Sequence, residues 1–389
     1  MNSFDAELEQ RLKTIREQNL FRELRRIDSP QSPHVRLAGK KFLNFSSNNY
    51  LGLANEPALK EAAIKAVEKF GAGSGASRLI CGSLAPHHEL EETLADFKKT
   101  GAALSFSSGY AAAIGTICAL AGNDDVIILD KLVHASLVDA AKLSGAKLRV
   151  FAHNDLDDLE EKLKWAAKNS QRTLLITESI FSMDGDAAQL REIVALKEKY
   201  GAWLMVDEAH ATGLFGKNRR GLAEELGISD RIEIQMGTLG KTLGASGGYI
   251  CGSRTLIDYL VNRARSFIFS TAPVPAAAAA AMAGIQITQS LEGEARRKIL
   301  FTRIAELESK SKIKTEKIQS AIVPLIIGDE NKTMKAAEAL RKQNIYVPGI
   351  RFPSVARGKA RLRVTLTATH TEEDVSRLTR ALETLDIGF

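Results

Sequence analysis

Apolar segments alternate with helix-like stretches between about residues 103 and 251, and this pattern restricts the fold more than any other feature. The apolar segments are Ala103–Ser107, Val126–Asp130, Lys147–Phe151, Thr173–Thr177, Ala202–Asp207, Ile232–Met236 and Gly248–Cys251. Helix-like stretches stand between most of them, for example Tyr110–Leu120, Leu156–Lys168 and Ala188–Tyr200. Strands that are apolar along nearly their whole length are typical of parallel sheets covered on both faces. The pattern therefore predicts an α/β fold with a mainly parallel sheet flanked by helices, and a ligand site at the carboxyl ends of its strands.

Other patterns before and after this region predict an N-terminal arm and a second, smaller domain. Residues from about 4 to 26 have a charged amphipathic pattern, and a helix there must pack on the body of the protein or on a partner subunit. After alanine-rich helices at about 275–308, the expected elements are Ala321–Ile327, Lys332–Gln343, Arg361–Thr365 and Glu372–Thr384. We therefore expect an arm over residues 1–50, a large α/β domain over 51–284 and a smaller C-terminal α/β domain over 285–389.

Composition narrows the class of protein and its partners. The 389 residues are 44% hydrophobic and 26% charged, which is typical of a globular protein. The net charge of +6 is spread without a basic block, which favours anionic small molecules over nucleic acid. Cys81, Cys118 and Cys251 lie far apart and are expected to be thiols in a reducing compartment. Because the start is polar and no apolar run approaches the ~20 residues of a membrane span, we expect a cytoplasmic protein.

A lysine, Lys241, stands in the Gly-, Ser- and Thr-rich stretch Met236–Gly248, directly after an apolar strand. Small side chains let a backbone approach a ligand closely. Three interpretations fit this stretch: a phosphate-binding loop, a lysine presented for Schiff-base chemistry, or a flexible glycine loop. A nucleotide-binding P-loop is disfavoured, because the position of its first glycine holds Gln235.

Three further motifs suggest functions that their surroundings disfavour. The G-x-G-x-x-A pattern at Gly71–Ala76 follows a predicted helix, whereas a dinucleotide-binding fingerprint follows a strand. Asp207–His210 spells D-E-A-H, but the P-loop that a helicase needs upstream is missing. His87 and His88 lack a zinc-ligand spacing and are better explained as the first turn of a helix.

The most informative pair of residues is Asp207 and Lys241. Asp207 ends an otherwise apolar strand, and Lys241 follows the next strand, so both are expected at the same edge of the sheet. This pair suits pyridoxal 5'-phosphate (PLP), whose aldehyde forms a Schiff base with a lysine and whose pyridine nitrogen is kept protonated by a carboxylate. The structural alternative for Asp207 is a helix N-cap.

Several other residues are placed to hold such a cofactor. Ser107–Tyr110 joins a strand to an alanine-rich helix, so free N–H groups point at an anion there. Thr238 stands three residues before Lys241 and could reach the same phosphate. Ser182 and His210 could hold the ring oxygen. His134 could stack on the pyridine ring, although a polar residue that begins a helix is the simpler explanation.

Taken together, the motifs resemble those of the PLP-dependent α-oxoamine synthases over nearly the whole chain. They are L-N-F-S-S-N-N-Y-L-G-L, G-S-G-A-S-R-L-I-C-G, F-A-H-N-D, E-S-I-F-S-M-D-G-D, W-L-M-V-D-E-A-H-A-T-G, the Lys241 loop and R-L-R-V-T-L-T-A-T-H. The resemblance implies the fold of the type I PLP enzymes and a homodimer with its active site between the subunits.

The resemblance also implies a role for each site residue. Lys241 would carry the cofactor and act as the base, Asp207 would pair with the pyridine nitrogen, and His134 would stack on the ring and contact substrate. The remaining cofactor contacts would be Gly109, Tyr110, Ser182, His210, Thr238 and, from the neighbouring subunit, Thr271. Arg22 and Ser354 match substrate-binding positions. Arg363 would clamp the amino-acid carboxylate, with Arg361 on the same face of the strand as the other candidate.

The reaction implied is a decarboxylative condensation of L-alanine with pimeloyl-CoA or a pimeloyl carrier protein, a step of biotin synthesis. The runner-up within the family joins glycine to acetyl-CoA. Ser354 stands where some relatives carry threonine, which changes the packing near the acyl chain. A third hypothesis is a PLP-binding sensor without turnover, although such a sensor has little use for a carboxylate clamp. No metal site is expected.

Overall fold

The protein's structure, a computed structural model, describes residues 3–310 and 318–385. The chain divides into two compact units, and each is described by itself. The large unit contains residues 49–182 and 186–298, and the small unit contains residues 1–48, 183–185 and 299–389. The three-part division expected from the sequence stays a prediction.

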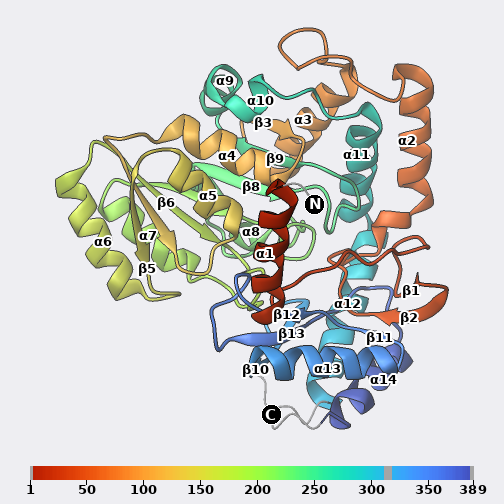
Figure 1. The fold of residues 1–389 in the computed structure, drawn as a ribbon. Coiled ribbons are helices and arrows are strands. Elements are labelled where there is room, and N and C mark those ends of the chain that lie inside the picture. Colours follow the sequence, from red (N-terminus) through yellow and green to blue (C-terminus); the bar gives the residue numbers. More distant parts are fainter. Residues whose placement is uncertain (1–2, 311–317, 386–389) are drawn as a thin grey trace. The chain divides into compact units, whose positions relative to one another are not determined.

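A seven-stranded sheet forms the centre of the large unit, with helices packed around it (Figure 1). Its strands are β3 (Ala102–Phe106), β4 (Val126–Asp130), β5 (Lys147–Phe151), β6 (Thr173–Glu178), β7 (Trp203–Asp207), β8 (Ile234–Thr238) and β9 (Gly248–Gly252). Their spatial order is β3-β9-β8-β7-β6-β4-β5. β9 runs opposite to the other six strands, which are parallel to one another, so the prediction of a mainly parallel α/β sheet is confirmed.

Several helices of the large unit begin where the sequence supplies suitable end groups. The helices of this unit are α2 (Pro57–Phe70), α3 (Ala85–Lys98), α4 (Gly109–Leu120), α5 (Ala135–Leu143), α6 (Leu156–Asn169), α7 (Leu190–Lys199), α8 (Leu222–Glu225), α9 (Arg254–Arg263), α10 (Arg265–Ile268), α11 (Pro275–Gln289) and the first part of α12 (Leu291–Lys310). Side chains of Ser108, Asp155 and Ser253 accept hydrogen bonds from the first turns of α4, α6 and α9. His87 bonds the N–H of Leu84 at the start of α3, as expected for a helix-starting residue.

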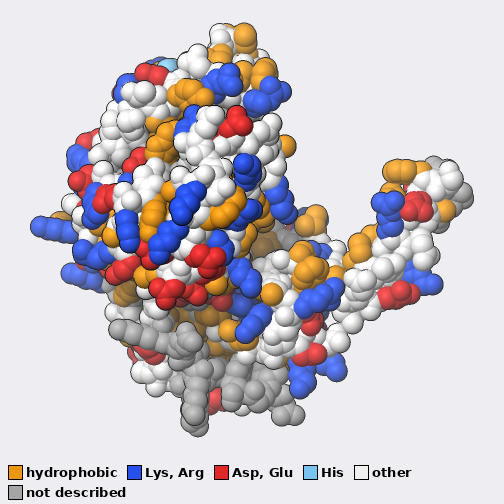
Figure 2. All heavy atoms as spheres, turned by 90° about the vertical axis from the view of Figure 1, so that its left-hand side faces the viewer, with side chains coloured by type: hydrophobic (Ala, Val, Ile, Leu, Met, Phe, Trp, Pro, Cys, Tyr) orange, Lys and Arg blue, Asp and Glu red, His pale blue; other side chains and the backbone are white. Residues whose placement is uncertain are grey.

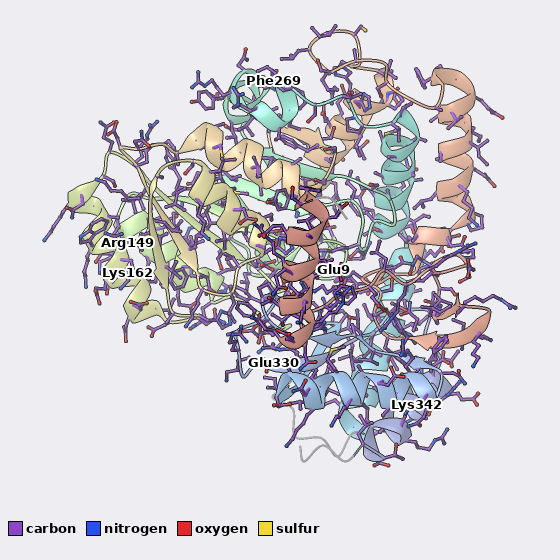
Figure 3. All side chains as sticks on the ribbon, viewed as in Figure 1. Glu9, Arg149, Lys162, Phe269, Glu330 and Lys342 are labelled. Carbon is purple, nitrogen blue, oxygen red and sulfur yellow. The ribbon has the colours of Figure 1, made fainter. Side chains whose placement is uncertain are left out.

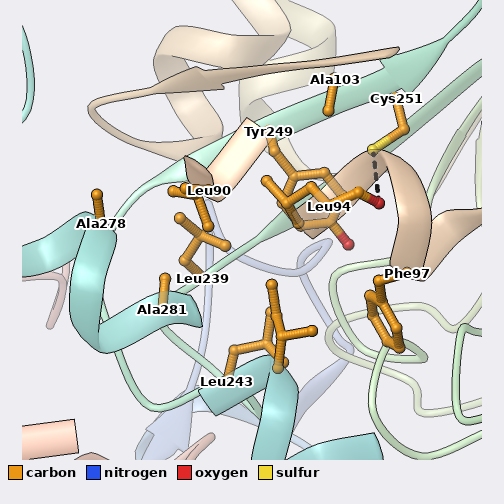
Figure 4. Packing of buried hydrophobic residues seen from close by; sticks show 11 residues of the cluster. Leu90, Leu94, Phe97, Ala103, Leu239, Leu243, Tyr249, Cys251, Ala278 and Ala281 are labelled. Carbon is orange, nitrogen blue, oxygen red and sulfur yellow. Dashed lines mark hydrogen bonds between the residues drawn. The ribbon is translucent and has the colours of Figure 1, made fainter. Parts of the chain in front are cut away.

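The loop that carries Lys241 is anchored in the core. Leu239 and Leu243, on either side of the lysine, are buried in one cluster with side chains of α3, β9 and α11 (Figure 4). Gly244 closes the turn with a φ of 69°, and a Cβ there would meet the backbone of Leu53 at 2.6 Å. The flexible-loop interpretation is therefore wrong, because apolar packing fixes this backbone on both sides of the lysine.

The small unit holds two three-stranded sheets, with orders β1-β2-β11 and β10-β13-β12. Its elements are α1 (Ser3–Glu17), β1 (His34–Leu37), β2 (Lys40–Asn44), the end of α12, β10 (Ile322–Gly328), α13 (Glu330–Lys342), β11 (Ile345–Tyr346), β12 (Gly349–Ile350), β13 (Ala360–Thr365) and α14 (Glu372–Glu383). The first helix is shorter than predicted, because it ends at Glu17 instead of near residue 26. Asn19 adopts a left-handed conformation with a φ of 55°, a common way for an asparagine to end a helix.

The surface carries mixed charge. On the face in Figure 2, Lys and Arg side chains are interspersed with Asp and Glu. Arg149 belongs to the edge strand β5 and Lys162 to α6 (Figure 3). The Arg149 guanidinium lies 3.9 Å from the centre of the Trp165 ring. Charged side chains on an edge strand discourage pairing with other chains. Within residues 3–310 and 318–385, no helix combines the length and the apolar character that a membrane crossing needs.

Candidate active site

Three neighbouring parallel strands of the large unit end in polar side chains. Glu178 of β6 is registered with Asp207 of β7, and Asp207 with Met236 of β8. Lys241 follows β8 by three residues, after Thr238. The carboxyl edge of the sheet therefore gathers two carboxyl groups, a hydroxyl and a lysine, the placement expected for Asp207 and Lys241.

Lys241 is held by a chain of hydrogen bonds. Its Nζ lies 2.8 Å from Nε2 of His210, and Nδ1 of the same ring lies 2.6 Å from the hydroxyl oxygen of Tyr50. Tyr50 and His210 are buried, with 0% and 5% of their surfaces exposed. The sequence singled out His210 but not Tyr50, whose segment S-S-N-N-Y-L-G-L served only as a family motif.

Asp207 is buried beside these groups. One oxygen accepts a hydrogen bond of 2.9 Å from the N–H of Ala209, and no helix begins at this point, so the N-cap alternative is wrong. Burial raises the pKa of Asp207, while the charges of Lys241 and His134 act in the opposite direction. In such buried surroundings, pairing with a cationic group such as a protonated ring nitrogen strongly stabilises a carboxylate.

The other residues of the D-E-A-H sequence have structural partners. Glu208 points to Lys98, whose fully buried Nζ lies 2.6 Å from the carboxylate. Burial acts to lower the pKa of Lys98, but Glu208 outweighs it and the pKa is raised. The other oxygen of Glu208 accepts a bond from the N–H of Ala223. The Lys98–Glu208 pair therefore stabilises the end of β7 next to Asp207.

Glu178 was missed by the sequence reasoning. One of its carboxyl oxygens accepts a bond of 2.5 Å from the N–H of His134, and the other a bond of 3.1 Å from the N–H of Ser182. Burial and the nearby charge of Asp207 raise the pKa of Glu178 to about 8, although Lys241 and the two N–H donors act to lower it. An acidic residue that ends an apolar strand was the available signal, as it was for Asp207.

His134 begins α5 and also faces the site. Its Nδ1 accepts a bond from the N–H of Ser136, so the helix-starting interpretation is confirmed. Burial lowers the pKa of His134, against the charge of Asp207. The residue therefore caps a helix and presents a mainly neutral ring next to Asp207, and the two interpretations of His134 are compatible.

A cradle for a phosphate group lies at the start of α4. The hydroxyl of Thr238 is buried and has no hydrogen-bond partner among the described residues. A Cβ on Gly109 would approach Cγ2 of Thr238 to 2.6 Å, so only glycine lets the start of α4 lie this close to Thr238. An unsatisfied hydroxyl beside the N-terminus of a twelve-residue helix is the donor set that a phosphate requires. Together with Lys241 and Asp207, these residues fit PLP.

Two predicted cofactor contacts lie at the surface of the large unit. The side chain of Tyr110 is half-exposed and donates a bond of 2.8 Å to Asp139. Thr271 is exposed and its backbone pairs with Ser77 in an isolated bridge. The contribution of Thr271 to a neighbouring subunit's site stays a prediction.

The predicted substrate residues Arg22, Ser354 and Arg363 belong to the small unit. On β13, Arg361 donates a bond of 2.5 Å to the carboxylate of Asp184, whereas Arg363 bonds the side-chain oxygens of Asn48 and Thr365. The two arginines thus differ in their partners, because Arg361 already pairs with a carboxylate. Ser354 is exposed.

Arg22 lines a groove of about 540 Å³ in the small unit, together with Arg25, Arg341 and Arg351. Arg351 bonds the carbonyl oxygens of Asn19 and Phe21 and the sulfur of Met334, which are all uncharged. Burial and the positive charge of Arg22 lower the pKa of Arg351. Glu23 and Glu338 also line the groove, and Glu338 pairs with Arg341, which still leaves an excess of positive charge that favours an anion.

Comparison with known proteins agrees with this geometry. The family described as aminotransferase class I and II matches residues 40–382. An 8-amino-7-oxononanoate synthase of Geotalea daltonii is 48% identical over 98% of this chain and 97% of its own length.

Solved structures show the same fold. A variant serine palmitoyltransferase of S. paucimobilis, bound to a PLP–myriocin aldimine, superposes with a TM-score of 0.92 at 29% identity, over 99% of this chain and 98% of that one. The 8-amino-7-oxononanoate synthase of Francisella tularensis gives a TM-score of 0.75 at 28% identity, over 88% and 96% of the two chains. The chain therefore belongs to the class I and II aminotransferase family, and it is an enzyme of the type I PLP fold whose cofactor is PLP.

Proposed function

We propose that this protein condenses L-alanine with a pimeloyl thioester, releasing carbon dioxide and the free thiol and yielding 8-amino-7-oxononanoate for biotin synthesis. The observation that carries the proposal is the placement of Lys241, which lies with Asp207, His134 and His210 at one edge of the sheet. The names of the relatives support the choice of reaction within the family.

Bound PLP supplies an electron sink for negative charge that develops at Cα of the amino acid. Asp207 would hold the pyridine nitrogen in its protonated form, and His134 would cover one face of the ring. Thr238 and the first turn of α4 would bind the phosphate. Lys241 would hold the cofactor and then, as a free amine in a buried site, remove the Cα proton.

Two regions of the small unit would recognise the substrates. Arg363 would bind the carboxylate of L-alanine in a bidentate manner, since Arg361 is paired with Asp184. The arginine groove that contains Arg22 would bind an anionic part of the acyl thioester. Ser354 would contact the acyl chain.

The protein would act as a cytoplasmic homodimer. The helix α1 buries none of its residues, and its apolar side chains Phe4, Leu8 and Ile15 are exposed. Phe269, labelled in Figure 3, is 69% exposed and lies two residues before Thr271. If a second copy of the chain covered these side chains, Thr271 of one subunit would approach the active site of the other subunit, as the family resemblance implies.

A comparative thiol assay tests the proposal. Purified wild-type protein should be yellow and should release free thiol from pimeloyl-CoA only when L-alanine is present. Lys241→Ala should be colourless and inactive. Thiol release with glycine and acetyl-CoA, and none with L-alanine, would assign the protein to the runner-up reaction. A yellow protein that releases no thiol from either pair would support the sensor hypothesis.

A further inference from the structure

Tyr50 is the one member of the Lys241 hydrogen-bond chain to which neither the sequence motifs nor the proposed reaction gives a role. Its hydroxyl lies 2.6 Å from Nδ1 of His210, whose other ring nitrogen lies 2.8 Å from Lys241. The two rings meet edge to face, with centres 6.0 Å apart and planes at 62°. The hydroxyl therefore reaches the edge of the imidazole and not its face.

We propose that Tyr50 is a positioning residue that orients the His210 ring through Nδ1 in either tautomer and thereby holds Nε2 towards Lys241. The proposal deepens the proposed function, since it concerns the same lysine. Tyr50 would act only through His210.

The donor and acceptor properties of the three groups support this role. A lysine ammonium has only donors, so next to it Nε2 of His210 must accept and Nδ1 must carry the ring proton. Nδ1 then donates to the oxygen of Tyr50. If Nε2 instead donates, as it would to the ring oxygen of bound PLP, Nδ1 must accept from the hydroxyl of Tyr50. A hydroxyl can do both, whereas a purely acceptor or purely donor group would allow only one tautomer.

The surrounding turn keeps Tyr50 in place. The N–H of Gly52 bonds the carbonyl of Asn49, and the side chain of Asn49 accepts from the N–H of Ala54. Leu51 and Leu53 are fully buried, with 0% of their surfaces exposed. A hydroxyl held by such a turn loses little conformational entropy when it bonds His210, as a positioning group requires.

The test is the tautomer of His210, measured by NMR on protein with ¹⁵N-labelled histidine rings. The chain has seven histidines, and His210→Gln identifies the signals of His210. In cofactor-free wild-type protein we expect Nδ1 to be protonated, and after addition of PLP we expect Nε2 to be protonated. In Tyr50→Phe the ¹⁵N chemical shift of Nδ1 should change both without and with the cofactor, because Nδ1 loses its hydrogen-bond partner whether it donates or accepts.

Tyr249→Phe is the matched control. Tyr249 is also fully buried, and its hydroxyl bonds Thr212 instead of a histidine. This variant should leave both His210 nitrogens unchanged. The dissociation constant of PLP, measured by titration of visible absorbance, should rise about tenfold in Tyr50→Phe and stay within twofold in Tyr249→Phe.

Two results would overturn the proposal. One is an identical His210 spectrum in wild type and Tyr50→Phe. The other, which needs no variant to fold, is a wild-type His210 that keeps the same tautomer before and after PLP is added. Neither measurement uses L-alanine or a thioester, so a failure of the proposed reaction in the thiol assay leaves this test unaffected.

Discussion

Glu178 and Asp207 are directly registered at the carboxyl ends of β6 and β7, and both carboxyl groups are buried. Two negative charges so close in a buried site repel each other. Burial raises the pKa of both carboxyl groups, and at Glu178 the charge of Asp207 adds to this effect and raises the pKa to about 8, while the charge of Lys241 acts to lower both pKa values. At neutral pH Glu178 is therefore mainly protonated, so Asp207, the residue that would face the pyridine nitrogen, has no second negative charge beside it.

The first prediction concerns the pH dependence of stability at Glu178. Its folded pKa is raised above the unfolded value of about 4.3, so unfolding releases a proton between these values and the stability of wild type falls as pH rises. Glu178→Gln lacks this dependence. Its amide bonds His134 and Ser182 less well, which costs about 1–3 kcal/mol at every pH. In melting curves of cofactor-free protein, the stability of the variant relative to wild type should increase from pH 5 to pH 8. A stability difference that stays constant over this range would contradict the raised pKa of Glu178.

The second prediction concerns His153, whose ring nitrogens lie 2.9 Å from Asp130 and 2.8 Å from Asp186. Burial acts to lower the pKa of His153, but the two carboxylates outweigh it and raise the pKa to about 10. The stabilisation is therefore complete below about pH 6.5 and is lost as pH rises towards 10. His153→Gln should cost about 3 kcal/mol at pH 7, measured by urea unfolding, and less at pH 10. An equal loss at both pH values would show that the imidazole is uncharged.

The third prediction tests the phosphate cradle. Gly109→Ala forces a methyl group against Cγ2 of Thr238 and so displaces the side chain whose hydroxyl would bind the phosphate. The dissociation constant of PLP should rise at least tenfold, because one or more charge-assisted hydrogen bonds are lost. Gly122→Ala is the control, since a Cβ there meets nothing within 4 Å. Unchanged PLP affinity in Gly109→Ala would remove Thr238 and α4 from the phosphate site.

The fourth prediction separates the two arginines of β13. Arg363→Gln should raise the KM for L-alanine at least tenfold, since a bidentate contact to the carboxylate is lost. Arg361→Gln leaves Asp184 without its partner and should lower the free energy of unfolding by about 2 kcal/mol, with a smaller change in KM. The opposite pattern, in steady-state kinetics and urea unfolding of both variants, would make Arg361 the clamp.

Local sequence determined much of the fold. The strands Val126–Asp130 and Lys147–Phe151 lie where the apolar pattern predicts them. The first is buried along its whole length, and the second is bounded by turns. The first helix was predicted too long, since its pattern continues past residue 17 while Asn19 turns the backbone out of the helix. A helix whose side chains remain exposed has no tertiary packing to fix its end.

The candidate site was predictable in part for a similar reason. Asp207 and Lys241 stand out because their types contrast with the residues around them. Glu178 had a local signal, an acidic residue at the end of a strand. Its contact with His134 and that of Tyr50 with His210 span 44 and 160 residues, and no local pattern predicts such contacts. In the sequence, a tyrosine in an apolar turn cannot be distinguished from an ordinary core residue. Only the structure shows that the hydroxyl of Tyr50 lies next to an imidazole.

The anchoring of Leu239 and Leu243 also bears on when the protein meets its cofactor. Since these two side chains are buried by the fold itself, the backbone around Lys241 is ordered as the chain folds, and the entropy cost of that ordering is met before PLP arrives. We therefore expect PLP to bind without a coupled folding step in this loop. We also expect the newly made chain to fold without PLP and to acquire it afterwards.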